Sequence, residues 1–153
     1  TEADELHYHF HVLIRFEIEK GLIEGSINVK ELDQIWNAKY QEYLGVDVPN
    51  DNMGVLQDVH WAHGSIGYFP TYSLGSFYAA QFFAKAVEAI PGLMDQIKTG
   101  NTSQLLTWLR EQVHQHGKMY TADELCTRIT GAPLNFKYFM DYARIKFGGI
   151  YGS

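Results

Sequence analysis

The stretch GVLQDVHWAHGSIGYFPTYSLG, from Gly54 to Gly75, decides the fold of this chain because it joins two different kinds of sequence. Its first part is rich in glycine and in side chains that form hydrogen bonds, which is typical of a loop with tight turns. Beyond Pro70 it passes into the most apolar run of the chain, from Thr71 to Ile90. We therefore expect a polar loop held at the N-terminus of a core helix, where side chains can be kept in fixed positions.

The polar residues of the apolar run predict how that helix packs. From residue 72 onward the strongly polar positions are Gln81, Lys85 and Glu88, at steps of four and three. This spacing leaves one thin stripe that could reach water, while the remaining faces must pack against protein. The sequence thus predicts a buried central helix at about residues 71–90.

The flanking sequence has a helical period and no strand pattern. Apolar residues recur three or four positions apart, and Asn28, Asn101 and Thr121 each precede a Glu or Gln by three residues, as in a capping box. No segment alternates between apolar and polar residues with turn dipeptides on both sides. We predict an all-α fold, a multi-helix array around the central helix that forms one domain over residues 1–153. The other helices are expected at about residues 3–24, 28–44, 91–100, 101–116, 121–131 and 135–147.

Composition excludes several classes of protein. A chain of 153 residues with 46% hydrophobic and 14% aromatic residues is long and apolar enough to bury a core. Its net charge of -6, with scattered Lys and Arg, excludes a nucleic-acid partner, and no apolar run is long enough to span a membrane. Cys126 is the only cysteine and cannot form an internal disulfide. We expect a soluble protein in a reducing, cytoplasmic compartment.

The histidines do not match a known metal motif. His7 and His11 stand one helical turn apart, with His9 between them, but a Glu beside the first His is absent because position 8 is Tyr. We interpret them as solvated or hydrogen-bonded helix histidines, with metal binding as the alternative. We assign no metal ligand within the chain, and Cys126 is interpreted as a small core residue.

The loop contains residue types that suit one chemical task. A Tyr hydroxyl and an imidazole N–H can both donate to an oxygen on which negative charge develops. If the backbone between Tyr68 and Tyr72 already turns into helix, both hydroxyls can project to the same side as His60. Gln57 or Asp58 could orient the imidazole by fixing which nitrogen donates. The alternative is an aromatic core cluster with ordinary hydrogen bonds, formed by Trp61, Tyr68, Phe69 and Tyr72.

Several segments resemble one protein family. GVLQDVHW at residues 54–61 is similar to the Gly-x-x-Gln-Asp-x-His-Trp motif of the thermostable zinc metallocarboxypeptidases, the carboxypeptidase Taq family. GYFPTYSLG at residues 67–75 and ADELHYHFHVLIRFEIEKGLI at residues 3–23 resemble the segments on either side of that motif in the family. WNAKYQEYLGV, PNDNMGVLQD and KFGGIYG fit as well, so the resemblance covers essentially the whole chain.

The resemblance implies a larger enzyme. The fold would resemble the C-terminal part of a neurolysin-like helical zinc peptidase. The family holds zinc through a His-Glu-x-x-His helix and a later Glu, which would lie upstream of Thr1, and this sequence contains no such motif. Ala3 and Asp4 match the end of the family's Ile-Arg-x-x-Ala-Asp motif, whose Arg would immediately precede Thr1. We expect a C-terminal portion left by trypsin-like proteolysis or by the choice of expressed region, and inactive alone.

The resemblance also assigns roles. Zinc would polarise the scissile carbonyl and lower the pKa of its bound water, and this chain would form the opposite wall of the groove. His60 and Tyr68 or Tyr72 would donate to the tetrahedral intermediate or to the C-terminal carboxylate of the peptide. A larger set would support the site or bind substrate: Gln57, Asp58, Trp61 and Asp4.

Two readings with different consequences remain. The first is the substrate-facing part of a metallocarboxypeptidase whose partners are a peptide C-terminus and the missing N-terminal portion. The second is a freestanding, non-catalytic helical domain that binds a peptide or a partner through the same groove. In either case the apolar surface left by missing helices favours a homo-oligomer, most simply a dimer. The sequence leaves open the preferred substrate side chain and the metal that the parent enzyme loads.

Overall fold

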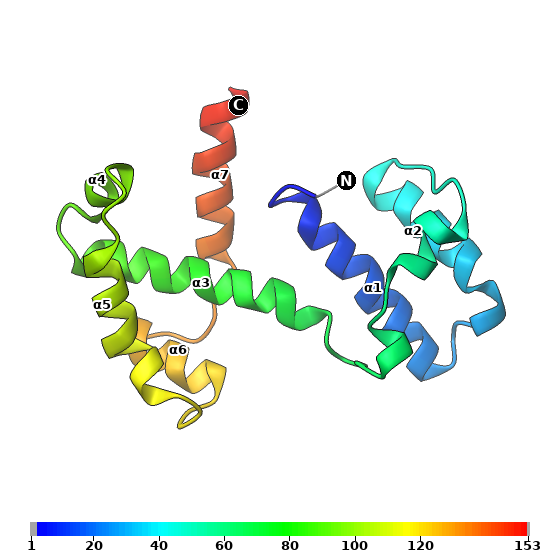
Figure 1. Ribbon diagram of the computed structural model, residues 1–153, viewed down its shortest axis with the longest axis horizontal. Helices are drawn as coiled ribbons and strands as arrows, with labels where there is room; N and C mark the ends of the chain where they lie inside the picture. Colours follow the sequence, from blue (N-terminus) through cyan, green and yellow to red (C-terminus); the bar gives the residue numbers. More distant parts are fainter. Residues whose placement is uncertain (1–2, 153) are drawn as a thin grey trace. The chain divides into compact units, whose positions relative to one another are not determined.

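All regular elements of the described residues are helical. The computed structural model describes residues 3–152, so Thr1, where we expect the cut end, lies outside it (Figure 1). Seven α-helices and five short 3-10 helices occur in this range, and they confirm the predicted all-α fold. The α-helices are α1 (His7–Glu24), α2 (Leu32–Leu44), α3 (Pro70–Ala89), α4 (Leu93–Lys98), α5 (Ser103–Gln112), α6 (Ala122–Thr130) and α7 (Lys137–Tyr151). The 3-10 helices are η1 (Val29–Glu31), η2 (Asp51–Met53), η3 (Val55–Gln57), η4 (Trp61–His63) and η5 (His114–His116).

The chain divides into two compact units. The first ends at Leu74 and the second begins at Gly75, so the N-terminal turn of α3 belongs to the first unit and the rest of α3 to the second. The description of residues 1–153 as one domain stays a prediction. Among residues 3–152, no helix combines the length and the apolarity that crossing a bilayer requires.

The first unit is built on the packing of α1 against α2. Ile14 and Ile18 lie one turn apart on α1 and form a buried cluster with Trp36 of α2. The chain leaves α1 through Gly25, whose φ of 73° is a left-handed conformation that glycine adopts without a steric penalty. The capping box predicted at Asn28 is wrong, because Asn28 accepts from the amide of Lys30 at 3.0 Å and caps η1 instead of α2.

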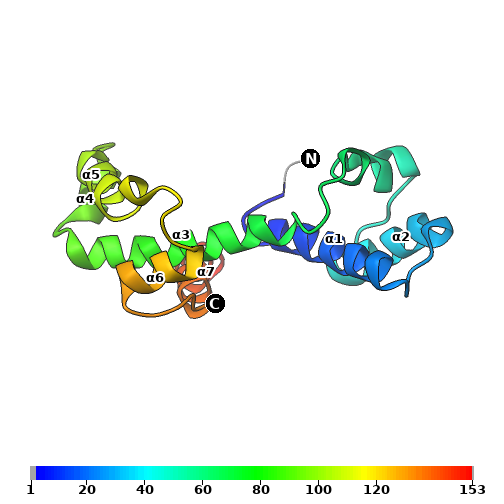
Figure 2. The ribbon, with the colours of Figure 1, turned by 90° about the horizontal axis from the view of Figure 1, so that it is seen from below.

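The second unit is arranged along α3. Figure 2 shows α4 and α5 on one side of α3 and α6 and α7 on the other. Ala86, Ile90 and Leu93 form its buried cluster at the junction of α3 and α4. The capping box predicted at Thr121 is present, because Thr121 and Glu124 each accept from the other's backbone amide. At Asn101 it is wrong, since Asn101 accepts from the amide of Ser103.

Helix α3 is less buried than its composition predicts. Within its described residues only Gln81 and Ala86 are buried, and the others are half-buried or exposed. Placing Gln81 on the water-facing stripe was wrong: it is fully buried, donates to the Thr130 hydroxyl at 2.9 Å and accepts from the Asn135 amide at 2.8 Å. The physical reason is that a side-chain amide can donate and accept at once, so it satisfies the polar backbone between α6 and α7.

Candidate active site

A cavity in the first unit brings the loop residues together. Its volume is about 850 Å³, and it is lined by α1, α2, the segment that follows α2, and the first turn of α3. His60, Asp58, Gln57 and Tyr72 all line it, and so does Arg15 of α1. Its size falls within the range of small-ligand pockets, roughly 300 to 1,000 Å³. The structure therefore places four of the predicted site residues on one concave surface.

Asp58 holds the imidazole of His60. Asp58 follows η3 in an extended conformation, and its Oδ1 accepts from the His60 backbone amide at 3.0 Å and lies 2.6 Å from His60 Nδ1. Its other oxygen, Oδ2, accepts from Arg15 Nε. Burial acts to raise the pKa of this carboxyl, but the hydrogen bonds from Arg15 and His60 outweigh burial and lower the pKa. Asp58 is therefore an ionised, nearly enclosed acceptor, with its side chain 4% exposed.

Tyr72, and not Tyr68, contacts the other side of the imidazole. The Tyr72 hydroxyl lies 2.9 Å from His60 Nε2. Tyr68 precedes the first helical residue, Pro70, so the expected helical spacing between the two tyrosines does not apply. The Tyr68 ring centroid is 6.0 Å from that of His60, and the ring packs edge-on against Tyr72. The geometry thus favours Tyr72 as the tyrosine that works with His60.

Two other predicted site residues of the loop have structural contacts of their own. Gln57 lines the cavity, but its amide donates to the carbonyl of Asn52 and not to His60. Trp61 donates from Nε1 to Glu19 Oε2 at 3.0 Å, and its ring packs edge-on against Trp36. Of Gln57 and Asp58, it is therefore Asp58 that orients the imidazole in the described structure. Trp61 anchors the loop to α1.

Asp4 caps the first helix. Its Oδ1 accepts from the amides of Leu6 and His7, each at 2.9 Å, and its Oδ2 lies 2.6 Å from His7 Nδ1. The bonds from the His7 amide and imidazole lower the pKa of Asp4 to about 2. From this segment it is Ala3 and Tyr8, not Asp4, that line the cavity. The part that Asp4 plays in a binding site stays a prediction.

Two residues that hold the candidate site in place were not predicted from the sequence, although a signal was present. Arg15 holds Asp58, and Glu19, which is 5% exposed, accepts from Trp61 and from the Gly67 amide at 2.7 Å. His7, His11, Arg15 and Glu19 recur every four residues, which places them in one column along α1. A column of polar residues beside buried isoleucines indicates partners on other elements, and the partner of Arg15 and Glu19 is the loop.

The helix histidines are hydrogen-bonded. His11 Nδ1 lies 3.0 Å from the Tyr40 hydroxyl, and burial, aided by the nearby charges of Arg15 and His7, lowers the pKa of His11. His9 Nδ1 lies 2.9 Å from the Ser73 hydroxyl, and burial lowers its pKa too. Within residues 3–152 no three His, Cys, Asp or Glu side chains gather in a way that could hold a metal ion. Cys126 is fully buried on α6, and burial raises the pKa of its thiol.

Comparison with known proteins identifies the class of this chain as metallopeptidase. The family model described as carboxypeptidase Taq (M32) metallopeptidase matches residues 1–147. Carboxypeptidase 1 of Bacillus subtilis is 43% identical over 151 residues, and thermostable carboxypeptidase 1 of Thermus thermophilus is 40% identical over 152 residues. Each alignment covers 99% of this chain and 30% of the relative.

Solved structures agree with this assignment. The M32 carboxypeptidase from Deinococcus radiodurans R1 superposes with a TM-score of 0.95 at 42% identity, over 99% of this chain and 31% of that chain. Metallocarboxypeptidase 1 of Trypanosoma cruzi gives a TM-score of 0.90 at 40% identity, over 95% of this chain and 31% of that one. The chain belongs to the carboxypeptidase Taq (M32) family, and it spans about 30% of the length of the curated relatives that it matches.

Proposed function

We propose that this chain is the substrate-facing C-terminal part of a metallocarboxypeptidase that removes C-terminal residues from peptides. The observation that carries the proposal is the hydrogen-bonded series Asp58, His60 and Tyr72 on the wall of the cavity. A series of this kind fixes the orientation of the Tyr72 hydroxyl at a concave surface, and a pre-oriented hydroxyl is a group that can stabilise a developing oxyanion. Family membership supports the same reaction class.

The rest of the cavity suits the end of a peptide. Tyr8, Trp36 and Phe69 contribute aromatic surface, and Arg15 and His60 contribute polar atoms. An apolar wall with a few fixed polar groups is the usual composition of a small-ligand site. We propose that the substrate's terminal side chain lies against the aromatic surface while its backbone faces His60 and Tyr72. Trp61 and Gln57 support the loop from behind.

The described part of the chain contains no group of side chains that could serve as metal ligands. The family is one of metallopeptidases, yet residues 3–152 contain no fitting cluster of ligands. We propose that the parent enzyme binds zinc through residues outside this chain. The residues present here would act on the substrate from the facing wall, by orienting it and by donating hydrogen bonds to its oxygens.

The assembly and compartment are proposals of the same kind. Large apolar side chains are exposed on α7, namely Ile145 at 79%, Ile150 at 61% and Tyr151 at 77%. Exposed apolar surface of this kind favours contact with other protein, and we propose that the remainder of the enzyme or a second copy covers it. We further propose that the enzyme is a dimer, for which this exposed surface is the argument, and that it is cytoplasmic, because the single cysteine of this chain suits a reducing compartment.

The second candidate is a non-catalytic peptide-binding domain. It is favoured by one observation, that the described residues have a cavity but no cluster of metal ligands.

One experiment separates the two functions. The full-length protein that carries this chain is incubated with a free-acid peptide and with the same peptide amidated at its C-terminus. The carboxypeptidase proposal predicts stepwise release of residues from the free acid, loss of release with a chelator, and resistance of the amide. Binding of both peptides without release would support the second candidate.

A further inference from the structure

One side chain in the cavity wall, Arg15, enters the proposed function only as a source of polar atoms. Arg15 carries a positive charge on α1 between the buried residues Ile14 and Ile18, and its side chain is 17% exposed. It does not touch His60 directly, but its Nε donates to the carboxylate that does. A largely buried cation costs free energy unless its N–H groups are hydrogen-bonded, so the acceptors around Arg15 indicate its role.

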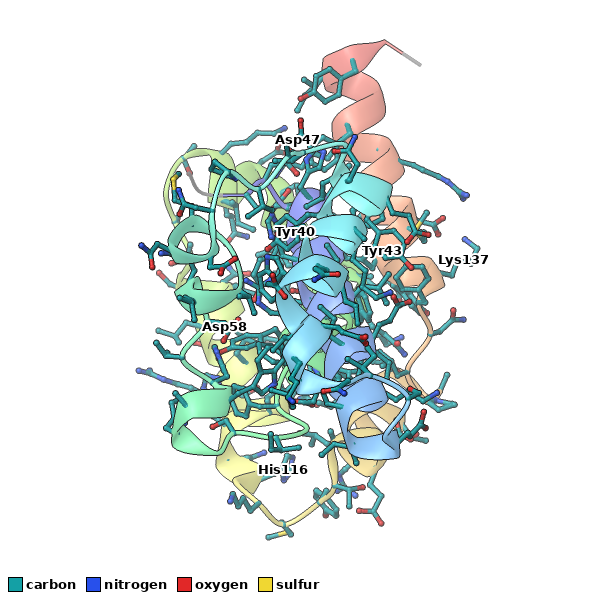
Figure 3. The ribbon with its side chains drawn as sticks, turned by 90° about the vertical axis from the view of Figure 1, so that its right-hand side faces the viewer. Tyr40, Tyr43, Asp47, Asp58, His116 and Lys137 are labelled. Carbon is teal, nitrogen blue, oxygen red and sulfur yellow. The ribbon has the colours of Figure 1, made fainter. Side chains whose placement is uncertain are left out.

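Arg15 is fixed by contacts from several elements. Its Nη1 donates to the His11 carbonyl at 2.8 Å and to the Tyr40 hydroxyl at 3.2 Å. Its Cζ lies 4.8 Å from the centre of the Trp36 ring, which stacks on Tyr40. Tyr40 on α2 and Asp58 in the loop, two of its partners, are labelled in Figure 3. The direction of Nε toward the loop is thus set by α1 and α2.

The fixed Arg15 also fixes Asp58. Because Oδ2 accepts from Arg15, Oδ1 is directed at His60, where it contacts the backbone amide and Nδ1. An ionised carboxylate only accepts hydrogen bonds, so His60 Nδ1 must carry a hydrogen. In the neutral imidazole Nε2 is then an acceptor, and the Tyr72 hydroxyl, 2.9 Å away, donates to it.

We propose that Arg15 is a positioning residue which, through Asp58, holds His60 in the Nδ1–H form, and that His60 thereby sets the direction in which the Tyr72 hydroxyl donates. The inference deepens the proposed function and rests on it for its catalytic consequence. Neutral His60 holds the Tyr72 hydrogen and does not itself donate from Nε2. When Nε2 takes a proton from a solvent hydronium ion, its N–H donates to the Tyr72 oxygen, and the phenol hydrogen turns toward a substrate oxygen in the cavity.

The step conserves atoms and leaves Tyr72 neutral throughout. The bond that forms is Nε2–H, and the bond that breaks is an O–H bond of a solvent hydronium ion, which is left as water. The phenol O–H bond does not break, and its hydrogen bond changes from Nε2 to the substrate oxygen. The groups that face the imidazole are Asp58 and Tyr72, which bond to it, and the rings of His63, Tyr68 and Phe69, with centroids at 5.8, 6.0 and 4.7 Å. Of these groups Asp58 is ionised, and Arg15 lies behind it.

The inference is tested by nitrogen NMR on the chain labelled with ¹⁵N-histidine. Long-range ¹H–¹⁵N spectra distinguish the protonated from the bare nitrogen of each neutral imidazole. We expect the native chain to show His60 in one form, with Nδ1 protonated. Arg15→Gln and Asp58→Asn should lose this single form and give a mixture with Nε2–H. Tyr72→Phe should keep it, because Asp58 still accepts from Nδ1. The signals of His9, whose Nδ1 lies 2.9 Å from the Ser73 hydroxyl in the same unit, report that the first unit of each variant remains folded.

Two outcomes would overturn the inference: a native His60 protonated at Nε2, or an Arg15→Gln spectrum identical to the native one. If Arg15→Gln does not fold, Asp58→Asn decides the matter by the same readout. Kinetics of the full-length enzyme test the consequence, since Tyr72→Phe should lower kcat on the order of 10²-fold with little change in KM. If the full-length protein has no peptidase activity, the proposed function fails, and the NMR result still decides how His60 is held.

Discussion

Removing the carboxylate of Glu19 should loosen the loop that carries the site. Glu19 is 5% exposed, and its two oxygens accept from Trp61 Nε1 at 3.0 Å and from the Gly67 amide at 2.7 Å. These two bonds span the loop that follows His60 and tie it to α1. Hydrogen bonds to a charged group contribute about 1.5 to 3 kcal/mol each. The Gly67 amide is in an exposed residue that water can solvate in part, so we expect Glu19→Ala to lower the free energy of unfolding by about 2 to 4 kcal/mol.

Urea unfolding followed by tryptophan fluorescence and by circular dichroism measures this loss. Glu19→Gln should fall between native and Glu19→Ala, because its single carbonyl oxygen can accept from one of the two donors while its NH₂ faces the other. Glu24→Gln on the same helix is the matched control: its side chain is 58% exposed and paired only with Lys20, so we expect a change within about 0.5 kcal/mol. If Glu19→Ala were no more destabilising than Glu24→Gln, the loop would not depend on the Glu19 bonds.

Three further predictions concern packing and pH. Gly54→Ala should destabilise the first unit by about 1 to 3 kcal/mol, because the added Cβ would lie 2.6 Å from a Val48 methyl. Gly75→Ala in α3 should instead stabilise the protein by about 0.5 to 1 kcal/mol, because nothing lies within 4 Å of the added Cβ. Thermal unfolding of the two variants measures both effects. Gln81→Ala should lower the free energy of unfolding by about 2 to 4 kcal/mol, since its bonds to the backbone before α7 are lost, and protection of the α6–α7 connection in hydrogen exchange should fall with it. Asp58 has a pKa below its ordinary value of about 3.9. The stability that its ionised form contributes is therefore present above that value and is lost as the pH falls through the folded-state pKa. Unfolding measured over a series of acidic pH values should show a difference in the free energy of unfolding between native and Asp58→Asn that disappears in this range.

The helical fold could be predicted because helix signals are local. Apolar spacing, the Thr121 capping box and the terminal glycines all act within a few residues of each other. The predicted caps at Asn28 and Asn101 failed because these side chains bond to an amide two residues on, a competing turn that the same residue types favour. Burial of α3 was overestimated because the sequence of one helix does not show how much protein surrounds it.

The site could be predicted where its contacts join residues that are close in the sequence. Asp58 and His60 are two residues apart, so their contact is local and follows from the residue types. Arg15 and Asp58 are 43 residues apart, and only tertiary packing of α1 against the loop brings them together. The choice of Tyr72 over Tyr68 depended on where α3 begins, and helix boundaries are the least certain part of a sequence-based prediction. Gln81 was misplaced because a polar side chain inside a protein depends on partners distant in the chain.

The central claim is that His60 faces the substrate of a carboxypeptidase from the wall of the cavity. The most direct measurement is kcat and KM of the full-length enzyme and its His60→Ala variant on a free-acid peptide. The account predicts that kcat falls by about 10² to 10³, the effect of losing one pre-oriented donor network, while KM changes only a few-fold. An unchanged kcat, or a loss confined to KM, would contradict it.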